Sequence, residues 1–289
     1  MNRLTAQPAG VAVIVVLWLV TLVAAFVTAA SLRARGDLVS AGALVAEAEA
    51  RHAAHAAIAV AALTLFDSQA GAPAHAGRSV AVALDGRTVE VAIREECGKI
   101  DLNTGWAALI TGLFAASASP RVAQAVLDWR DPDSRPRPGG AEDADYRAAG
   151  LPHGARDGPF ESVEELMQVL GVDHPLYVEV APHLTVDCLN AGVEPLAASV
   201  RVLEAIPNLA AGTLPAFLEE REAYLAGRAV TPPQPVGGEP YLESSSAVAF
   251  AITATVESPI RFRWEAVVVL AGDALRPYLV RAWRRPVGP

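Results

Sequence analysis

The chain has few cysteines, no excess of basic residues and no recognisable catalytic signature, and each shortage argues against a class of protein. Of its 289 residues only Cys97 and Cys188 are cysteines, too few for a disulfide-built scaffold or a cysteine zinc site. Lysine and arginine number 23 against 32 acidic residues, so the formal net charge is -9. Nucleic-acid binding requires a basic surface, and this charge argues against it.

Signatures of hydrolytic enzymes are missing as well. No Gly-x-Ser-x-Gly or His-Glu-x-x-His motif accompanies the six histidines. His52 and His55 share one face of a predicted helix, but the sequence offers no third metal ligand, so we expect both to pack with their polar tips exposed. A hydrolytic enzyme, here a membrane-anchored periplasmic hydrolase, is therefore only an alternative to the function class that the rest of the sequence favours.

The most informative feature present is the apolar run from Val11 to Leu32, which contains no charged residue. As a helix it is long enough to cross the roughly 30 Å hydrocarbon core of a bilayer. The small and polar residues that would fit a processing site precede the run and end at Gly10, so we expect cleavage between Gly10 and Val11. An uncleaved signal anchor is the alternative. In either case the carboxyl side is expected to be exported.

Periodicity predicts an α+β fold. A helical pattern continues from the apolar run to Phe66, and alternation in Ser79 to Glu95 around Asp85-Gly86 predicts a hairpin. Further strands are expected at 248–256, 262–268 and 278–282, with helical pattern between the two sets. The expected segments are a leader (1–10), a transmembrane half-helix (11–32), the remaining helix with the first strands (33–103), an all-α domain inserted in an antiparallel sheet (104–238) and the last strands (239–289).

The predicted insertion contains a weak repeat of short capped helices. Asn103 or Thr104, Ser162 and Ser199 are candidate caps, and Ser162 with Glu165 fits a capping box. Helix-hairpin-helix DNA binders also use short helices, but the second glycine of their turn is absent after Gly171. That binding function stays a minor alternative.

Several motifs together resemble one known family. The sequence Gly98-Lys99-Ile100-Asp101-Leu102-Asn103-Thr104 is followed by the block Asp128-Trp129-Arg130-Asp131-Pro132-Asp133 and then by Arg137-Pro138-Gly139-Gly140-Ala141-Glu142-Asp143 and Tyr146. With the Gly10 junction and the apolar helix, this order resembles the K-type minor pseudopilins of the type II secretion system. The likeness spans most of the chain.

The resemblance implies a pilin-like fold and an assembly role. It implies cleavage and methylation by a prepilin peptidase, a single-pass inner-membrane anchor with a periplasmic C-terminal region, and contacts with the secretion platform and with I- and J-type minor pseudopilins. Most pilin-like subunits carry a glutamate at the fifth residue of the mature helix, where this chain has Val15. The apolar residue implies a place at the fibre tip, with no subunit above, and relaxed sequence in a signal anchor is the alternative.

The strongest chemical cluster is acidic. The loop after Asp128 is bent by prolines and by Gly139-Gly140, and calcium prefers carboxylate oxygens on such loops. The predicted ligands are Asp131, Asp133, Glu142, Asp143 and Asp145. Calcium binding in family members supports the hypothesis. The alternative is a solvated loop paired with Arg130, Arg135 and Arg137.

Cys97 and Cys188 each precede a repeat-like segment in a compartment expected to be oxidising. A disulfide between them and two independent buried thiols are both open at this point.

Overall fold

The computed structural model describes residues 9–67, 79–84, 87–117, 119–244, 248–257, 261–273 and 275–284. Most of the expected leader, the Asp85-Gly86 turn and the Ser258-Pro259 break lie outside these residues. So does most of the loop expected from Asp67 to Gly77.

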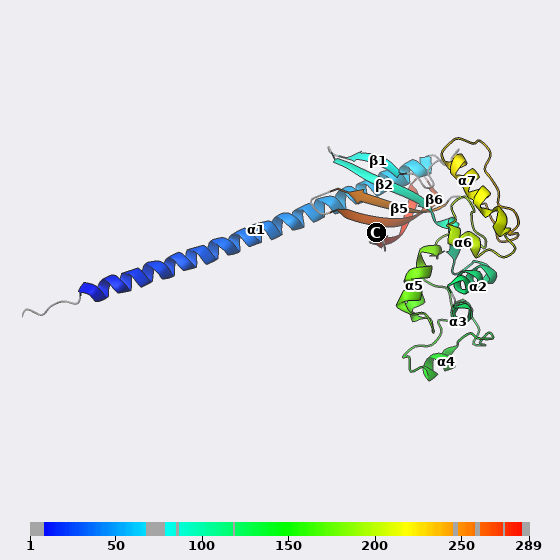
Figure 1. Ribbon diagram of the computed structural model, residues 1–289, viewed down its shortest axis with the longest axis horizontal. Helices are drawn as coiled ribbons and strands as arrows, with labels where there is room; N and C mark the ends of the chain where they lie inside the picture. The colour runs from blue at the N-terminus through cyan, green and yellow to red at the C-terminus, as the bar shows by residue number, and fades with distance from the viewer. Residues whose placement is uncertain are drawn as a thin grey trace, which may run out of the picture.

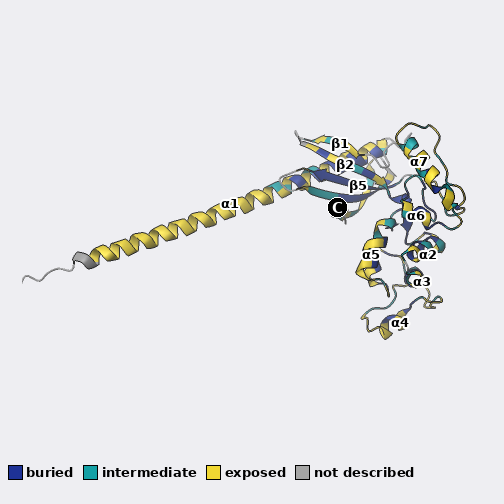
Figure 2. Cartoon of the chain, viewed as in Figure 1, coloured by how far each residue is buried: buried dark blue, intermediate teal, exposed yellow. Residues whose placement is uncertain are grey.

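One long helix forms the amino-terminal part of the molecule. Helix α1 runs from Ala9–Asp67, 59 residues, as the sequence pattern predicts. Figure 1 shows it as a rod that projects far beyond the rest of the chain. Residues 12–45 are exposed, and burial begins near Ala50 (Figure 2). Among the described helices α1 is long and apolar enough to cross a membrane, with a mean hydropathy of 2.7 in its most apolar window.

The carboxyl half of α1 packs on an antiparallel sheet of five strands. The strands are β1 (Ser79–Leu84), β2 (Arg87–Glu95), β5 (Ala249–Val256), β6 (Phe262–Asp273) and β7 (Arg276–Arg284), in the order β1-β2-β5-β6-β7. Alanines 54 and 57 and Ile58 of α1 share a core with Ile93 and Ile252. Small residues on α1 let the helix lie close to the sheet, and the alternating apolar residues of the strands face it.

Strands β2 and β5 are neighbours in the sheet but are separated in sequence by a large insertion. Its elements are η2 (Glu96–Gly98), β3 (Ile100–Asp101), α2 (Ala107–Ala116), α3 (Pro120–Arg130), α4 (Asp143–Ala148), η3 (Val163–Gln168), α5 (His174–Val180), η4 (Ala181–His183), β4 (Leu184–Thr185), α6 (Val200–Glu204), η5 (Ala211–Thr213) and α7 (Leu214–Leu225). Figure 1 shows the insertion beyond the end of the sheet that is distal to the start of α1.

The insertion is mostly helical but not all-α, which corrects one part of the predicted fold class. Strands β3 and β4 pair in parallel, Ile100 with Leu184 and Asp101 with Thr185. Its own hydrophobic core begins at Ile100, and Leu242 packs against it. Residues on both sides of the predicted range of 104–238 thus contribute to this core.

The predicted helix caps are only partly correct. Ser199 accepts a hydrogen bond from the Val202 amide at 3.2 Å and caps α6 as predicted. Ser162 makes no side-chain cap bond, so the predicted capping box with Glu165 is wrong. The Glu165 carboxylate instead accepts hydrogen bonds from the Trp129 indole at 3.2 Å and the Arg156 guanidinium at 2.8 Å. The N-cap residue of α2 is Trp106, not Asn103 or Thr104.

Candidate metal site and disulfide

The acidic loop begins where α3 ends. Asp131 is the C-cap of α3 and has an extended backbone, as expected for a residue that precedes a proline, here Pro132. Arg130, in the last turn, donates hydrogen bonds to the carbonyls of Leu102 at 2.6 Å and Gly105 at 2.9 Å. The end of α3 is thereby attached to the segment just after β3. This contact explains why the two motifs occur together in the sequence.

Asp128, on α3, holds the acidic loop against this helix by accepting hydrogen bonds from loop residues. Its side chain is fully buried. It accepts hydrogen bonds from the backbone amides of Arg137 at 3.1 Å and Ala141 at 2.9 Å, and from the Arg137 guanidinium at 2.9 Å. A Cβ on Gly140 would lie 1.8 Å from the nearer Asp128 oxygen, so only glycine permits this approach. The double glycine of the sequence motif thus allows the loop to fold back onto α3.

Three of the five predicted ligands lie together. Asp131, Asp133 and Glu142 each place a carboxylate oxygen within 4.8 Å of the others. Glu142 is only 4% exposed. Oδ1 of Asp131 has no hydrogen-bond partner among the described residues, and the Glu142 carboxylate, apart from its capping-box contact with the Asp145 amide at the start of α4, makes no other hydrogen bond with them. Buried carboxylates without partners are costly, and a divalent cation with oxygen ligands would compensate them. The residues present therefore fit calcium.

Electrostatics at Glu142 agree with this assignment. Burial, followed by the nearby charges of Asp128 and Asp157, raises the pKa of Glu142 to about 7. Asp157 was not among the predicted residues. Its own pKa is raised by burial and by Asp143, Asp131 and Asp133, which identifies it as part of the same acidic region. A possible sequence signal was the Asp157-Gly158 dipeptide, and Asp157 has a positive φ of 53°.

Asp143 and Asp145 are not part of the cluster. They belong to the first turn of α4, where the helical geometry directs them elsewhere. Asp145 accepts a hydrogen bond from the Glu142 amide at 3.0 Å, and Asp143 lies 3.9 Å from Arg147 on the exposed surface. Asp145 thus helps to begin α4 directly after Glu142.

The loop arginines have different roles. Arg137 bonds both Asp128 and Asp131, and these bonds raise its pKa, with the hydrogen bond to Asp131 the largest cause. Arg130 binds backbone carbonyls, as described above. The predicted alternative of a loop neutralised by its arginines is therefore partly realised at Arg137, but Glu142 has no such partner among the described residues.

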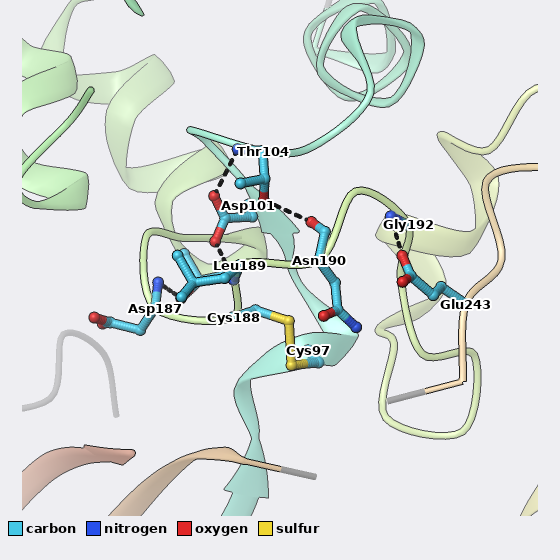
Figure 3. Close-up of a disulfide and its surroundings, with 10 residues drawn as sticks. Cys97, Asp101, Thr104, Asp187, Cys188, Leu189, Asn190, Gly192 and Glu243 are labelled. Carbon is cyan, nitrogen blue, oxygen red and sulfur yellow. Dashed lines mark hydrogen bonds between the residues drawn. A yellow bond between two sulfur atoms is a disulfide. The ribbon is translucent and has the colours of Figure 1, made fainter. Parts of the chain in front are cut away.

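Cys97 and Cys188 form a disulfide in the structure (Figure 3). Cys97 lies in η2, just after strand β2, and Cys188 follows strand β4. Next to the bond, the buried Asp101 accepts hydrogen bonds from the amides of Thr104 at 3.0 Å and Leu189 at 2.9 Å. The disulfide therefore joins the end of the five-stranded sheet to the interior of the insertion.

The two helical histidines form no metal site with other described residues. His55 lies against Trp283, with ring centroids 4.3 Å apart, and at 6.2 Å from Trp264. His52 and His55 are both exposed. The carboxylate cluster is the one group in the described part of the chain that could hold a metal.

The region that contains the acidic loop is similar to a known protein family. A family model described as type II secretion system, protein K, matches residues 101–187. The resemblance to protein K is confirmed over these 87 of the 289 residues. The match begins at Asp101 in β3, contains the carboxylate cluster and β4, and ends one residue before Cys188.

A curated relative supports the same conclusion over a limited length. Type II secretion system protein K of Pectobacterium carotovorum subsp. carotovorum is 33% identical over 79 residues, which is 26% of this chain and 24% of the relative. The match therefore spans about a quarter of that protein K.

A solved structure extends the likeness to the fold. The crystal structure of the GspK-GspI-GspJ complex from the enterotoxigenic Escherichia coli type 2 secretion system contains a chain that aligns with 89% of this one. All of that chain is covered, with a TM-score of 0.59 and 15% identity. At 15% identity the likeness is one of fold, and it extends over most of the chain.

Proposed function

We propose that this chain is a minor pseudopilin of the type II secretion system that helps to export folded proteins across the outer membrane. The observation that carries the proposal is the position of the protein K region. In sequence it lies between the neighbouring strands β2 and β5, in a fold whose first helix is apolar for half its length. Such a molecule is built to be anchored and to assemble, since the long exposed half of α1 is not covered by any other described part of the chain.

The proposed partners are I- and J-type minor pseudopilins, because the solved complex contains them together with its K-type chain. To test this, affinity-tagged full-length chain would be purified in mild detergent from cells that produce candidate I- and J-type subunits. We expect stable copurification of both. Recovery of the chain without either subunit, at expression levels that yield folded protein, would contradict the assignment.

The proposed position is the tip of the pseudopilus. Val15 supports it, because a subunit with no neighbour above has no use for a carboxylate buried in the bilayer, which is costly when unpaired. The insertion supports it as well: it lies beyond the sheet at the end of the molecule away from the apolar half of α1 (Figure 1). A domain in that place would obstruct a subunit stacking above it.

Cysteine crosslinking in assembled fibres tests the position. Probes on the exposed face of α7 should give no crosslinks to shaft subunits, whereas probes on the exposed half of α1 should give them. Regular copies of this chain along the shaft, or α7 contacts to a subunit above it, would refute the tip assignment.

The proposed cellular state is a processed inner-membrane subunit. A prepilin peptidase would cut between Gly10 and Val11 on the cytoplasmic side, and the new amine would be methylated. The apolar half of α1 would then anchor the chain, with the sheet and the insertion in the periplasm.

We also propose that Asp131, Asp133 and Glu142 bind calcium. The support is the buried Glu142 carboxylate and the Asp131 oxygen that lacks a partner among the described residues. Calcium takes six to eight oxygen ligands, so water or other oxygens would complete the shell. The ion would neutralise the cluster and order the loop between α3 and α4. The disulfide between Cys97 and Cys188 is proposed to form in the periplasm and to join the insertion to the sheet.

A further inference from the structure

The side chains that would hold calcium are themselves held by two residues that would not touch the ion. Asp128 has no free capacity for a cation. One of its oxygens accepts the Arg137 and Ala141 amides at 3.1 and 2.9 Å, and the other accepts the Arg137 guanidinium at 2.9 Å. Its side chain is fully buried. Asp128 is therefore a hydrogen-bond acceptor inside the loop and not a ligand.

Each partner of Asp128 is connected to one ligand. The Arg137 guanidinium also bonds Oδ2 of Asp131, which leaves Oδ1 of Asp131 buried and unpartnered. The Ala141 amide immediately precedes Glu142, the buried ligand whose carboxylate has only its capping-box contact with the Asp145 amide among the described residues. One carboxylate in the last turn of α3 is thus connected to two of the three ligands, Asp131 and Glu142.

We infer that Asp128 and Arg137 are positioning residues that preorganise the cation site, an inference that rests on the proposed calcium binding. Residues that orient metal ligands typically change metal affinity by about 10- to 100-fold when they are replaced. Asp128 acts by accepting hydrogen bonds from backbone amides, and Arg137 acts through one guanidinium nitrogen, Nη1, that donates to both the Asp128 and the Asp131 carboxylate. Neither function is retained by a residue of similar size with different hydrogen bonding.

The test compares Asp128→Asn with Asp187→Asn in the full-length chain in detergent micelles, with calcium chloride titrated by calorimetry. Asp187 is a matched control because its side chain is 10% exposed and lies 3.0 Å from Arg281, outside the cluster. We expect Asp128→Asn to weaken calcium binding by about 10-fold or more and Asp187→Asn to leave the Kd unchanged.

A second measurement separates positioning from general stability. A structural defect lowers the melting temperature equally with calcium and with chelator. Loss of positioning instead reduces the increase in melting temperature that calcium produces. If Asp128→Asn does not fold, Arg137→Gln replaces it, since the Arg137 side chain is 39% exposed. Arg137→Gln should also weaken binding, and Arg137→Lys should restore little of it.

The outcomes distinguish this inference from the proposal beneath it. If the unmodified chain binds no calcium, the proposed site is wrong. If the unmodified chain binds calcium and a folded Asp128→Asn or Arg137→Gln variant binds it with the same Kd, the site stands. The positioning role is then wrong.

Discussion

Cys97 and Cys188 are 91 residues apart in sequence, yet their Cα atoms lie 5.1 Å apart and a disulfide joins them. The bond connects η2, which follows strand β2, with the segment that follows strand β4. It therefore closes most of the insertion into a loop.

The first prediction is a large loss of stability without this bond. In the chain-entropy model, a loop of this length stabilises the folded state by about 4 to 5 kcal/mol. Cys97→Ser, Cys188→Ser and the double variant should therefore lower the free energy of unfolding by similar amounts, because each removes the same bond. Denaturant unfolding with and without reductant measures it. Labelling of both thiols in the unfolded, unreduced chain would show that the bond does not form.

The second prediction concerns Gly98, beside the disulfide. A Cβ at this position would lie 2.3 Å from the backbone carbon of Ala197, which cannot move away as a flexible side chain could. Gly98→Ala should destabilise the chain by about 1 to 3 kcal/mol, as overpacking does. Gly212→Ala is the control, since nothing lies within 4 Å of its added Cβ. Equal melting temperatures for the two variants would contradict the close packing of η2 against the backbone of Ala197.

Much of the fold follows from periodicity. The apolar run and the alternating strands predicted α1 and the five-stranded sheet, and the hairpin register pairs Val82 with Val89. Other features carry no such signal. Strands β3 and β4 have two residues each, too short for any alternation, and their pairing depends on how the insertion folds.

The sequence predicted an acidic site in this loop, but it did not show which carboxylates belong to the site. Spacing could not show that α4 begins at Asp143 and removes Asp143 and Asp145 from the cluster. It also could not show that Asp157, from a later loop, shares the same electrostatic region. Long-range contacts of this kind arise from tertiary packing. The capping box at Ser162 failed for the same reason, because Trp129 and Arg156 take the Glu165 carboxylate.

The third prediction is stabilisation by calcium. A ligand that binds only the folded state adds about 2.7 kcal/mol at 100 times its Kd. We expect calcium to raise the melting temperature of the chelated protein, and Asp131→Ala with Asp133→Ala to abolish the increase. Asp143→Ala is a matched control, because Asp143 is acidic and near but lies outside the cluster. A melting curve unaffected by calcium would leave only the solvated-loop alternative.

The fourth prediction is a pH dependence of the chelated protein that originates at Glu142. Its folded pKa of about 7 lies above the ordinary value of 4.5. The folded state therefore holds a proton that the unfolded state has released, so the contribution of Glu142 to stability is complete below pH 4.5 and is lost as pH rises through 7. Calcium affinity should show the opposite trend and fall below pH 7, because the ion must displace the proton.

Glu142→Gln provides the test of that assignment. The variant stays neutral at every pH, so its free energy of unfolding in chelator should vary less between pH 5 and 8 than that of the unmodified chain. If the two profiles are parallel, the pH dependence originates at other groups.

The last prediction is removal of residues 1–10. The Gly10–Val11 bond lies in the first turn of α1, which begins at Ala9. A protease must bind extended backbone, and the first turn of a helix opens at low cost because its amides have no partners within the helix. Gly10 lowers that cost further, since glycine weakens a helix by about 1 kcal/mol relative to alanine. In cells that contain a prepilin peptidase, mass spectrometry should find a chain that begins at Val11 with a methylated amine. Gly10→Leu should retain the leader, whereas Gly36→Leu, in the same helix with open space around it, should be cleaved normally. Cleavage after Ala30, or an intact amino terminus in the unmodified chain, would refute the processing site and leave the uncleaved anchor.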